Sequence, residues 1–432
     1  MKHDTRPTDD SQNRADGRRE VHGTSKGRTR QAFARASKNT LGVGLAAMLV
    51  GAFGLSATSA AAATRVGAEA RAGASVEAAV AGGRVDLETP SVSDPTSITN
   101  PRFPISDLTQ VIQLGEEDGV ELRHEITLLD ATKVIEWNGQ RVETVVSQFV
   151  AYGDGLILEV ALDYFAQADD GSVWYFGEDV SNYEDGVVVD HDGTWLAGRD
   201  GPPGMIMPAD PQVGDVYRPE NIPGLVFEEV TVTAVDQTVN GPTGPVPGAI
   251  FVQEELQDGT LEDKVFAPGY GEFRARVETE GELVTVAVAV PTDAVGGAVP
   301  RELTVLSSGA TDIFRTTRWD RISSTIETMN SAWATYQRGD VPELLQAEMT
   351  ESLDALVAAV HRRDVSATQQ AAVDVALAAL DLELQYRAVG DIDRARLGVW
   401  QRQLTLDRVT HDAAGVASDK AIIDAIRDRL SG

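Results

Sequence analysis

The 432-residue chain contains no cysteine. This absence excludes disulfide bonds, thiolate metal sites, covalently attached haem and cysteine nucleophiles. It also excludes the cysteine-linked lipid that anchors bacterial lipoproteins, so any membrane anchor must be an apolar segment of the chain itself.

Histidine is scarce, and the common catalytic motifs are absent. Only four of the six histidines follow residue 63: His124, His191, His361 and His411. None belongs to a His-Glu-x-x-His motif, and no two share a helix face four residues apart, so a zinc hydrolase lacks its ligands. After residue 63 the sequence also lacks a Gly-x-Ser-x-Gly elbow, a phosphate-binding loop and a dinucleotide-binding glycine motif. We therefore predict no catalytic residue and no cofactor, and we favour a protein that is not an enzyme.

Positive charge is scarce outside the N-terminal region. Residues 1–40 hold ten Lys or Arg against five Asp or Glu, and residues 41–63 hold none. From Thr64 onward the balance is 37 − 10 = 27 basic against 67 − 5 = 62 acidic residues, a formal charge of −35. Such a body repels nucleic acid and anionic lipid and attracts cations and basic partners. We expect no nucleic-acid partner.

Residues 1–63 have the layout of a secretory leader. Basic residues up to Lys38 precede an uncharged run, Leu41 to Leu55, and small residues follow at 59–63. This order is typical of a signal peptide, with cleavage after Ala61 or Ala63. Because the run is shorter than the roughly twenty residues that span a bilayer, we favour cleavage over a retained N-terminal anchor. The chain is expected to be secreted or associated with the cell envelope, touching a membrane only through an uncleaved leader.

The body divides by texture into a spacer, a β region and a helical region. Residues 64–97 show no periodicity and predict a disordered spacer. In residues 98–292, turn dipeptides of the Asn-Gly or Asp-Gly type separate β-branched and aromatic runs, as at 118–119, 138–139, 154–155 and 185–186. In one such run, Glu159 and Asp163 lie on the face opposite the apolar one. The pattern predicts half-buried strands in an antiparallel β-sheet or barrel-like domain.

The last part of the chain has helical periodicity. Residues 293–315 contain Gly, Pro and Ser and predict a linker. Apolar stripes follow with spacings of three and four residues, from Trp319 to Tyr336, Leu345 to Val360, Val373 to Leu384, Ile392 to Leu406 and Ile422 to Leu430. They predict an α-helical bundle of four to five helices over residues 316–432. The fold class is therefore α+β in separate domains, with few core contacts expected between them.

Two groups of polar residues are candidates for binding. Aromatic and acidic side chains gather between Asp163 and Trp195 and could bind a sugar, a cation or a basic peptide. The candidate ligand-binding residues are Tyr164, Trp174, Tyr175, Glu178, Asp179, Tyr183 and Trp195. In the bundle, Asp374, Asp381 and Asp407 interrupt apolar faces and are candidate metal ligands. Because the bundle region has no Glu-x-x-His, we favour salt bridges from Asp374 and Asp381 to the arginines at 394, 396 and 402.

Residues 100–275 resemble a group of uncharacterised exported bacterial β-domain proteins. The matching segments are Asp163-Tyr164-Phe165-Ala166-Gln167, Val173-Trp174-Tyr175-Phe176-Gly177-Glu178-Asp179, Gly193-Thr194-Trp195, Pro203-Gly204-Met205-Ile206-Met207-Pro208, Val213-Gly214-Asp215 and Ala267-Pro268-Gly269-Tyr270-Gly271. The region from Ala371 to Arg408 resembles another uncharacterised exported helical module. The resemblance implies a β domain in the envelope and carries no functional residues.

Three functions remain open at this stage. The first is a non-catalytic extracytoplasmic protein that binds a small ligand or an unknown envelope partner. The second is a cation-binding or iron-handling envelope protein with carboxylate ligands. The third is a hydrolase with paired carboxylates.

Export is directly testable. Residues 1–70, fused to a reporter that is active only outside the cytoplasm, should produce reporter activity because they carry the complete leader. Mass spectrometry of the exported full-length chain should find an N-terminus near Ala62 or Thr64. An intact Met1 on membrane-bound protein would contradict cleavage and establish the anchor.

Overall fold

The computed structural model describes residues 83–431, which belong to one compact unit. The predicted leader and residues 64–82 of the predicted spacer lie outside the described residues. The rest of the spacer is not disordered, because it is bonded to the sheet. The Ser91 hydroxyl and the Ser93 backbone N–H each donate to Asp169 over 2.8 Å, and Arg84 bridges to Val216. No helix within residues 83–431 is both long and apolar enough to cross a membrane.

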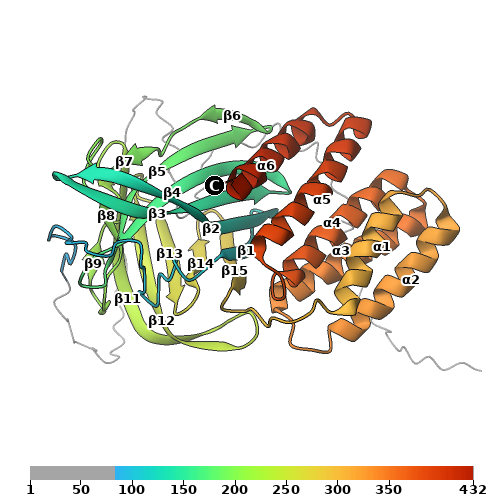
Figure 1. Cartoon of the computed structure of the whole chain (residues 1–432), viewed down its shortest axis with the longest axis horizontal. Coiled ribbons are helices and arrows are strands. Elements are labelled where there is room, and N and C mark those ends of the chain that lie inside the picture. The colour runs from blue at the N-terminus through green and yellow to red at the C-terminus, as the bar shows by residue number, and fades with distance from the viewer. Residues whose placement is uncertain (1–82, 432) are drawn as a thin grey trace, which may run out of the picture. The chain divides into compact units, whose positions relative to one another are not determined.

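Fifteen strands form one antiparallel sheet (Figure 1). They are β1 (Gln110–Glu117), β2 (Val120–Trp137), β3 (Gln140–Gly153), β4 (Leu156–Gln167), β5 (Val173–Glu184), β6 (Val187–Asp190), β7 (Trp195–Leu196), β8 (Gly204–Met207), β9 (Val216–Tyr217), β10 (Asn221–Ile222), β11 (Val226–Asn240), β12 (Pro245–Leu256), β13 (Leu261–Ala267), β14 (Gly271–Val277) and β15 (Glu282–Val290). Between β2 and β3, Asn138 and Gly139 have φ angles of 50° and 75°. Both values are positive, as a two-residue hairpin requires, so this predicted turn is confirmed.

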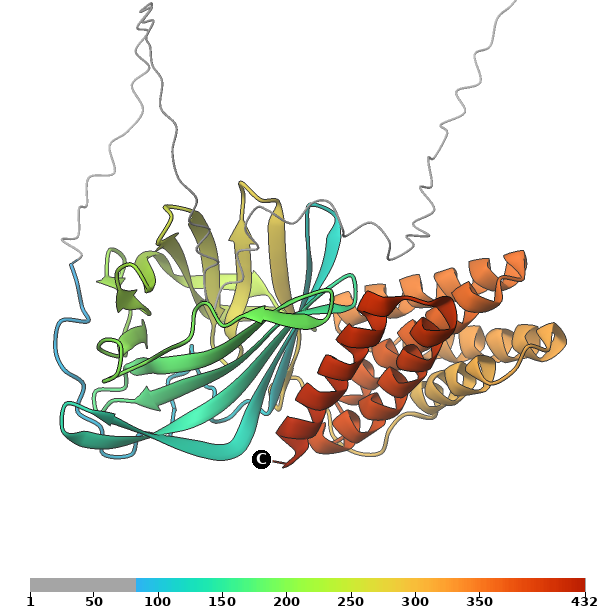
Figure 2. The same ribbon diagram turned by 90° about the horizontal axis from the view of Figure 1, so that it is seen from above.

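The sheet curls until its two ends approach each other (Figures 1 and 2). The strand order is β10-β11-β12-β13-β14-β15-β1-β2-β3-β4-β5-β6. Near the ends, β5 also pairs with β8, and β11 also pairs with β9. The Met205 N–H of β8 donates to the Arg218 carbonyl beyond β9 over 2.9 Å, which joins the two ends. The predicted antiparallel β region is confirmed, and its curl creates an interior.

Where the helices pack on the sheet, around β2 to β4, both of its faces are buried, whereas the sequence predicted one buried face. Successive strand residues point to opposite faces. On β2, Arg123 and Glu125 reach the helices, whereas His124 points into the curl and lies beside Phe149, with ring centroids 5.1 Å apart. The face of β4 that carries Glu159 and Asp163 is also buried. Acidic residues on that face are therefore enclosed rather than solvated.

Six helices follow the sheet: α1 (Arg301–Phe314), α2 (Trp319–Tyr336), α3 (Glu343–Arg362), α4 (Val365–Glu383), α5 (Val389–Thr410) and α6 (Ala413–Ser431). The five predicted stripes correspond to α2 through α6. The predicted linker at 293–315 is wrong over residues 301–314, because Leu303, Leu306 and Ile313 form a buried stripe there. The small residues beside them, which suggested a linker, let helices pack closely: a Cβ at Gly309 would lie 2.6 Å from Met329 Sδ.

The sheet and the helices share their core, so the expectation of few core contacts between them is wrong. Val288 and Val290 of β15 belong to one apolar cluster with Leu303 of α1 and residues of α2 to α5. In a second cluster, Tyr152 of β3 stacks on Trp400 of α5, with ring centroids 6.2 Å apart. Each part covers apolar surface that the other would otherwise expose to water.

Six charged side chains also join the sheet to the helices. This sheet–helix ion network comprises Arg123, Glu125, Asp381, Asp393, Arg396 and Arg429. Asp381 accepts hydrogen bonds from Arg396 over 2.7 Å and from Arg123 over 2.5 Å. Arg429 donates to Asp393 over 2.6 Å and to Glu125 over 2.9 Å. Burial alone would raise the pKa of Glu125, but the arginines 396, 429 and 123 hold it below its ordinary value.

The ion network predicts the effect of Asp381→Asn. The substitution leaves Arg396 and Arg123 facing a neutral group in a buried setting, so the free energy of unfolding should fall by about 3–5 kcal/mol. The surface acid Asp424 forms an exposed pair with Arg427, so Asp424→Asn should change stability by less than about 0.5 kcal/mol. Urea denaturation measures both, and a chelator should leave the wild-type midpoint unchanged. Marked destabilisation of the wild type by the chelator would point to a metal instead.

Candidate functional site

Three of the seven predicted ligand-binding residues meet inside the curled sheet. Tyr175 and Trp195 contact each other edge to face, with ring centroids 5.5 Å apart. Glu178 is the register partner of Trp195. The Trp195 indole N–H donates to Glu220 over 2.8 Å, which adds an acid from outside the predicted segment. The interior of the curl is therefore lined by aromatic rings and carboxyl groups together.

The other four predicted residues lie elsewhere. The Tyr164 hydroxyl donates to Asp179 over 2.5 Å, and Lys133 lies 3.9 Å above the Tyr164 ring, where both charged groups are partly exposed. Trp174 is buried and donates to the Ser172 hydroxyl. Tyr183 packs against the cluster between the sheet and α6. Neighbouring strand residues point to opposite faces, so this local richness in aromatic and acidic residues does not form one site.

The three candidate metal ligands are not gathered into a site. Asp381 lies in the ion network, where the predicted salt bridge to Arg396 is present. Asp374 accepts from Gln370 and Asp407 from Gln403, each over 2.9 Å. Across residues 83–431, no three side chains of His, Cys, Asp or Glu are grouped so as to hold a metal ion.

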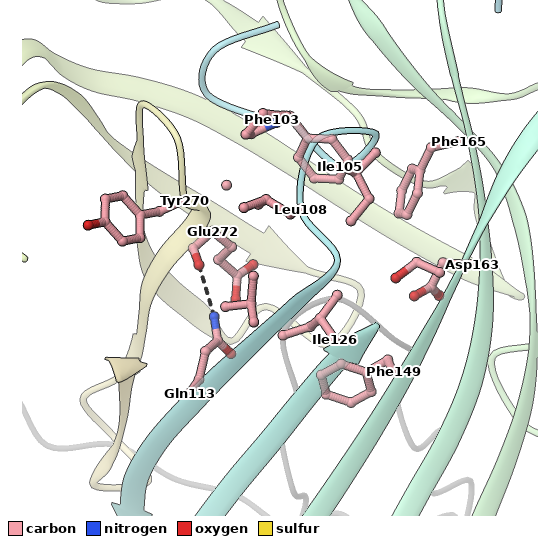
Figure 3. Close-up of a pocket in the computed structure, with 14 residues that line it drawn as sticks. Phe103, Ile105, Leu108, Gln113, Ile126, Phe149, Asp163, Phe165, Tyr270 and Glu272 are labelled. Carbon is pink, nitrogen blue, oxygen red and sulfur yellow. Dashed lines mark hydrogen bonds between the residues drawn. The ribbon is translucent and has the colours of Figure 1, made fainter. Parts of the chain in front are cut away.

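A cavity of about 50 Å³ lies inside the curl, beneath residues 103–108 (Figure 3). Its lining comes from the 103–108 segment and from strands β1 to β4 and β14. The lining residues are Phe103, Pro104, Ile105, Leu108, Val111, Gln113, Ile126, Ser147, Phe149, Asp163, Phe165, Tyr270, Gly271 and Glu272. Since about 10–15 Å³ of such space holds one water molecule, the cavity holds a group of a few non-hydrogen atoms.

The polar atoms of the cavity wall are mostly acceptors. Asp163 accepts from the Tyr175 hydroxyl over 2.9 Å. The fully buried Ser147 Oγ has no hydrogen-bond partner among the described residues, and Glu272 Oε2 accepts no hydrogen bond but lies 3.8 Å from Lys264 Nζ. Gln113 is already engaged, because its amide N–H donates to the Glu272 carbonyl and its Oε1 lies 3.2 Å from His124 Nδ1. Unpaired buried acceptors are costly, and an occupant that donates hydrogen bonds would satisfy them.

The cavity belongs to an interior that is rich in acid. Nine buried carboxyl groups of the β region make up this set, the interior acids: Glu159, Asp163, Glu178, Glu220, Glu228, Glu254, Glu262, Glu272 and Glu282. Lys264 is the only buried lysine among the described residues. It contacts Glu254, Glu262 at 3.3 Å and Glu272 at 3.8 Å. One ammonium group cannot balance nine carboxylates.

The pKa values of the interior acids reflect this imbalance. Burial raises the pKa of Asp163 to about 7, that of Glu272 to about 8 and that of Glu282 to about 9. Burial and neighbouring carboxyl groups also raise the pKa of Glu178 well above its ordinary value. Several interior acids are therefore protonated at neutral pH in the folded protein, because ionising them together without cations is unfavourable.

Local sequence reading missed most of these acids. Glu220, Glu254 and Glu272 were not candidates, and Asp163 and Glu159 were placed on the face opposite the apolar one. One signal was present in the sequence: Lys264, one of only three lysines after residue 63, lies two residues from Glu262 on the same strand face.

These pKa shifts predict how stability depends on pH. At pH 7 the affected carboxyls are protonated in the folded chain but ionised in the unfolded chain, so unfolding releases protons. The free energy of unfolding should therefore fall from pH 7 to pH 9, by up to about 1.4 kcal/mol per pH unit for each carboxyl still protonated. Urea denaturation at pH 7, 8 and 9 measures this fall in the free energy of unfolding. His124 contributes little in this range, because burial lowers its pKa to about 4 and it is already neutral.

Two glutamate-to-glutamine substitutions, one at an interior acid and one at an exposed acid, serve as test and control for this measurement. Glu282→Gln removes one interior acid and should make the decline shallower. Glu278→Gln changes a carboxyl that is 79% exposed in the neighbouring turn and should leave the decline unchanged. A free energy of unfolding that stays level or rises between pH 7 and pH 9 would contradict the interpretation.

No family model, curated protein or solved structure matches this chain. The resemblance to uncharacterised exported proteins remains an expectation. The candidate site is therefore interpreted from its own geometry: a small, mostly apolar cavity with unpaired acceptors, set in an acid-rich interior.

Proposed function

We propose that the protein is a non-catalytic extracytoplasmic protein that binds a small ligand in the cavity beneath residues 103–108. The observation that carries the proposal is the unpaired, fully buried Ser147 Oγ in a cavity whose wall is largely apolar. Small-ligand sites have this composition, with apolar walls and a few polar groups that fix orientation. The extracytoplasmic location rests on the leader sequence alone.

The wall of the cavity favours a bound molecule of defined size. The 103–108 segment is held firmly, because Asn100 donates to the carbonyls of Gly171 and Pro208, and Gly269 N–H donates to the Pro101 carbonyl. Phe103 packs edge to face on Phe165, with centroids 4.9 Å apart. A preformed wall limits the ordering cost of binding. With a volume of about 50 Å³, the cavity would take a small ligand or one end of a larger one.

The two alternatives have less support. An iron or other metal site needs several converging ligands, whereas Asp374, Asp381 and Asp407 each bond to separate partners. A glycosidase-like hydrolase needs two carboxyls that a substrate can reach. Asp163 and Glu272 line the cavity, but its volume of about 50 Å³ leaves no room for a sugar ring between them, and the adjacent pair Glu178 and Glu220 is at most 2% exposed and does not line it.

Ligand binding can be tested with four-carbon probes on the full chain. We expect butylamine, butanol or butyrate at one hundred times its dissociation constant to stabilise the wild type by about 2.7 kcal/mol, as thermal or urea unfolding would show. Val111→Phe fills the cavity and should abolish the effect, whereas Val295→Phe makes the same change at an exposed position and should retain it. Stabilisation by none of the probes, or equal stabilisation of Val111→Phe, would contradict the proposal.

A further inference from the structure

The cavity wall selects for the charge of its occupant. Two carboxyl groups reach it from different strands, Asp163 from β4 and Glu272 from β14, and both are buried. Figure 3 shows them on opposite sides of the cavity, with Ile105, Leu108 and Ile126 between them. No arginine or lysine lines the cavity, and the amide N–H of Gln113 is already bonded. An anion would therefore be repelled once either carboxyl ionises, and no positively charged side chain of the cavity wall would stabilise it.

The interior acids extend this preference beyond the cavity wall. The Asp163 carboxyl interacts electrostatically with that of Glu220, and the Glu272 carboxyl interacts with those of Glu262 and Glu254. Together these acids make the interior favourable for a cation. Lys264 is already in contact with three glutamates and cannot neutralise the rest. In a low-dielectric interior, such groups attract a cation strongly. Ionisation of the carboxyls becomes favourable once a cation is present.

The apolar part of the wall determines which cation fits. Phe103, Phe149 and Phe165 line the cavity and offer ring faces and edges, which attract organic cations and alkyl groups alike. A bare metal ion needs four to eight oxygen or nitrogen ligands, whereas Asp163, Glu272, Ser147 and Gln113 are the only polar side chains here besides Tyr270. A primary ammonium has several donors, which suits the Asp163 carboxyl and the Ser147 hydroxyl, since these two residues are register partners on β4 and β3.

We infer that the cavity binds the ammonium end of a small primary amine, held by Asp163 and Ser147, with its alkyl part against the phenylalanine rings. This inference rests on the proposed function and specifies the chemical class of the ligand. The charge-assisted hydrogen bonds from the ammonium group would be stronger than those from a neutral donor of equal length.

Calorimetry on the full chain with butylamine and butanol, at pH 8 in an amine-free buffer, tests the inference. Butylamine is cationic at this pH and butanol is its neutral match, so butylamine should bind at least about tenfold more tightly. Asp163→Asn should weaken butylamine binding at least about tenfold while changing butanol binding less than about threefold, whereas Glu272→Gln, on the opposite side of the cavity, should weaken butylamine binding less than Asp163→Asn does. The exposed-site control, Glu278→Gln, should bind both probes as the wild type does.

A milder variant protects the test against misfolding. Ser147→Ala removes only a hydroxyl, and it should weaken butylamine binding more than butanol binding. Equal affinity for both probes, or unchanged butylamine affinity in Asp163→Asn and Ser147→Ala, would overturn the amine assignment but leave a ligand cavity. Binding that persists in Val111→Phe would instead place the probe elsewhere and reject the cavity itself.

Discussion

The contact between Arg123 of β2 and Asp381 of α4 is the point at which the sheet and the helices depend on each other. The Asp381 carboxylate is 0% exposed and bonds to guanidinium groups from both parts, Arg123 and Arg396. Neither part could bury this surface alone without leaving a charge unpaired in an apolar setting. The ion network therefore requires the two parts to dock in one register, while the apolar clusters around it supply most of the driving force.

Successive side chains of β2 point to opposite faces of the sheet, and the two faces differ in their electrostatic environment. Arg123 and Glu125 point outward, where three arginines and three acids of the ion network balance one another. His124 points inward, where acids outnumber bases and burial keeps the imidazole neutral by lowering its pKa. Helices with their own charged residues cover the outer face, whereas the inner face has only the curled sheet itself as a partner. The uncompensated charge is thus confined to the interior that contains the cavity.

Much of the fold could be predicted from local patterns, and the site could not. Hairpin turns and helical stripes depend on residues within a few positions of each other, and most of these predictions were confirmed. Helix α1 was missed because Gly309 and its serine neighbours suggest a linker unless the apolar spacing of Leu303, Leu306 and Ile313 is weighed against them. The Asp381–Arg396 pair was predicted because both residues lie on adjacent helices. Arg123, 258 positions from Asp381, had no local signal that could reveal it.

The same limit applies to the candidate site. Richness in aromatic and acidic residues selected one segment, 164–195, although period-two alternation sends its members to different faces. Whether the acidic face of a strand is exposed to solvent or buried depends on how far the whole sheet curls. That curl depends on two pairings, of β5 with β8 and of β11 with β9. The strands β8 and β9 are too short to give a clear pattern in the sequence. Glu220 and Glu272 became visible as site residues only once this closure was known.

The position of Arg429 in the ion network has a consequence for the order of folding. Its partner Glu125 lies 304 positions earlier in the chain, so during synthesis the strand that carries Glu125 emerges long before α6. Until α6 docks, Glu125 lacks one of its partners and the outer face of β3 and β4 lacks its apolar cover. Contacts of such long sequence separation form slowly, because a large loop must close before they can contribute. The outer face of β3 and β4 therefore stays without this apolar cover until α6 has been synthesised.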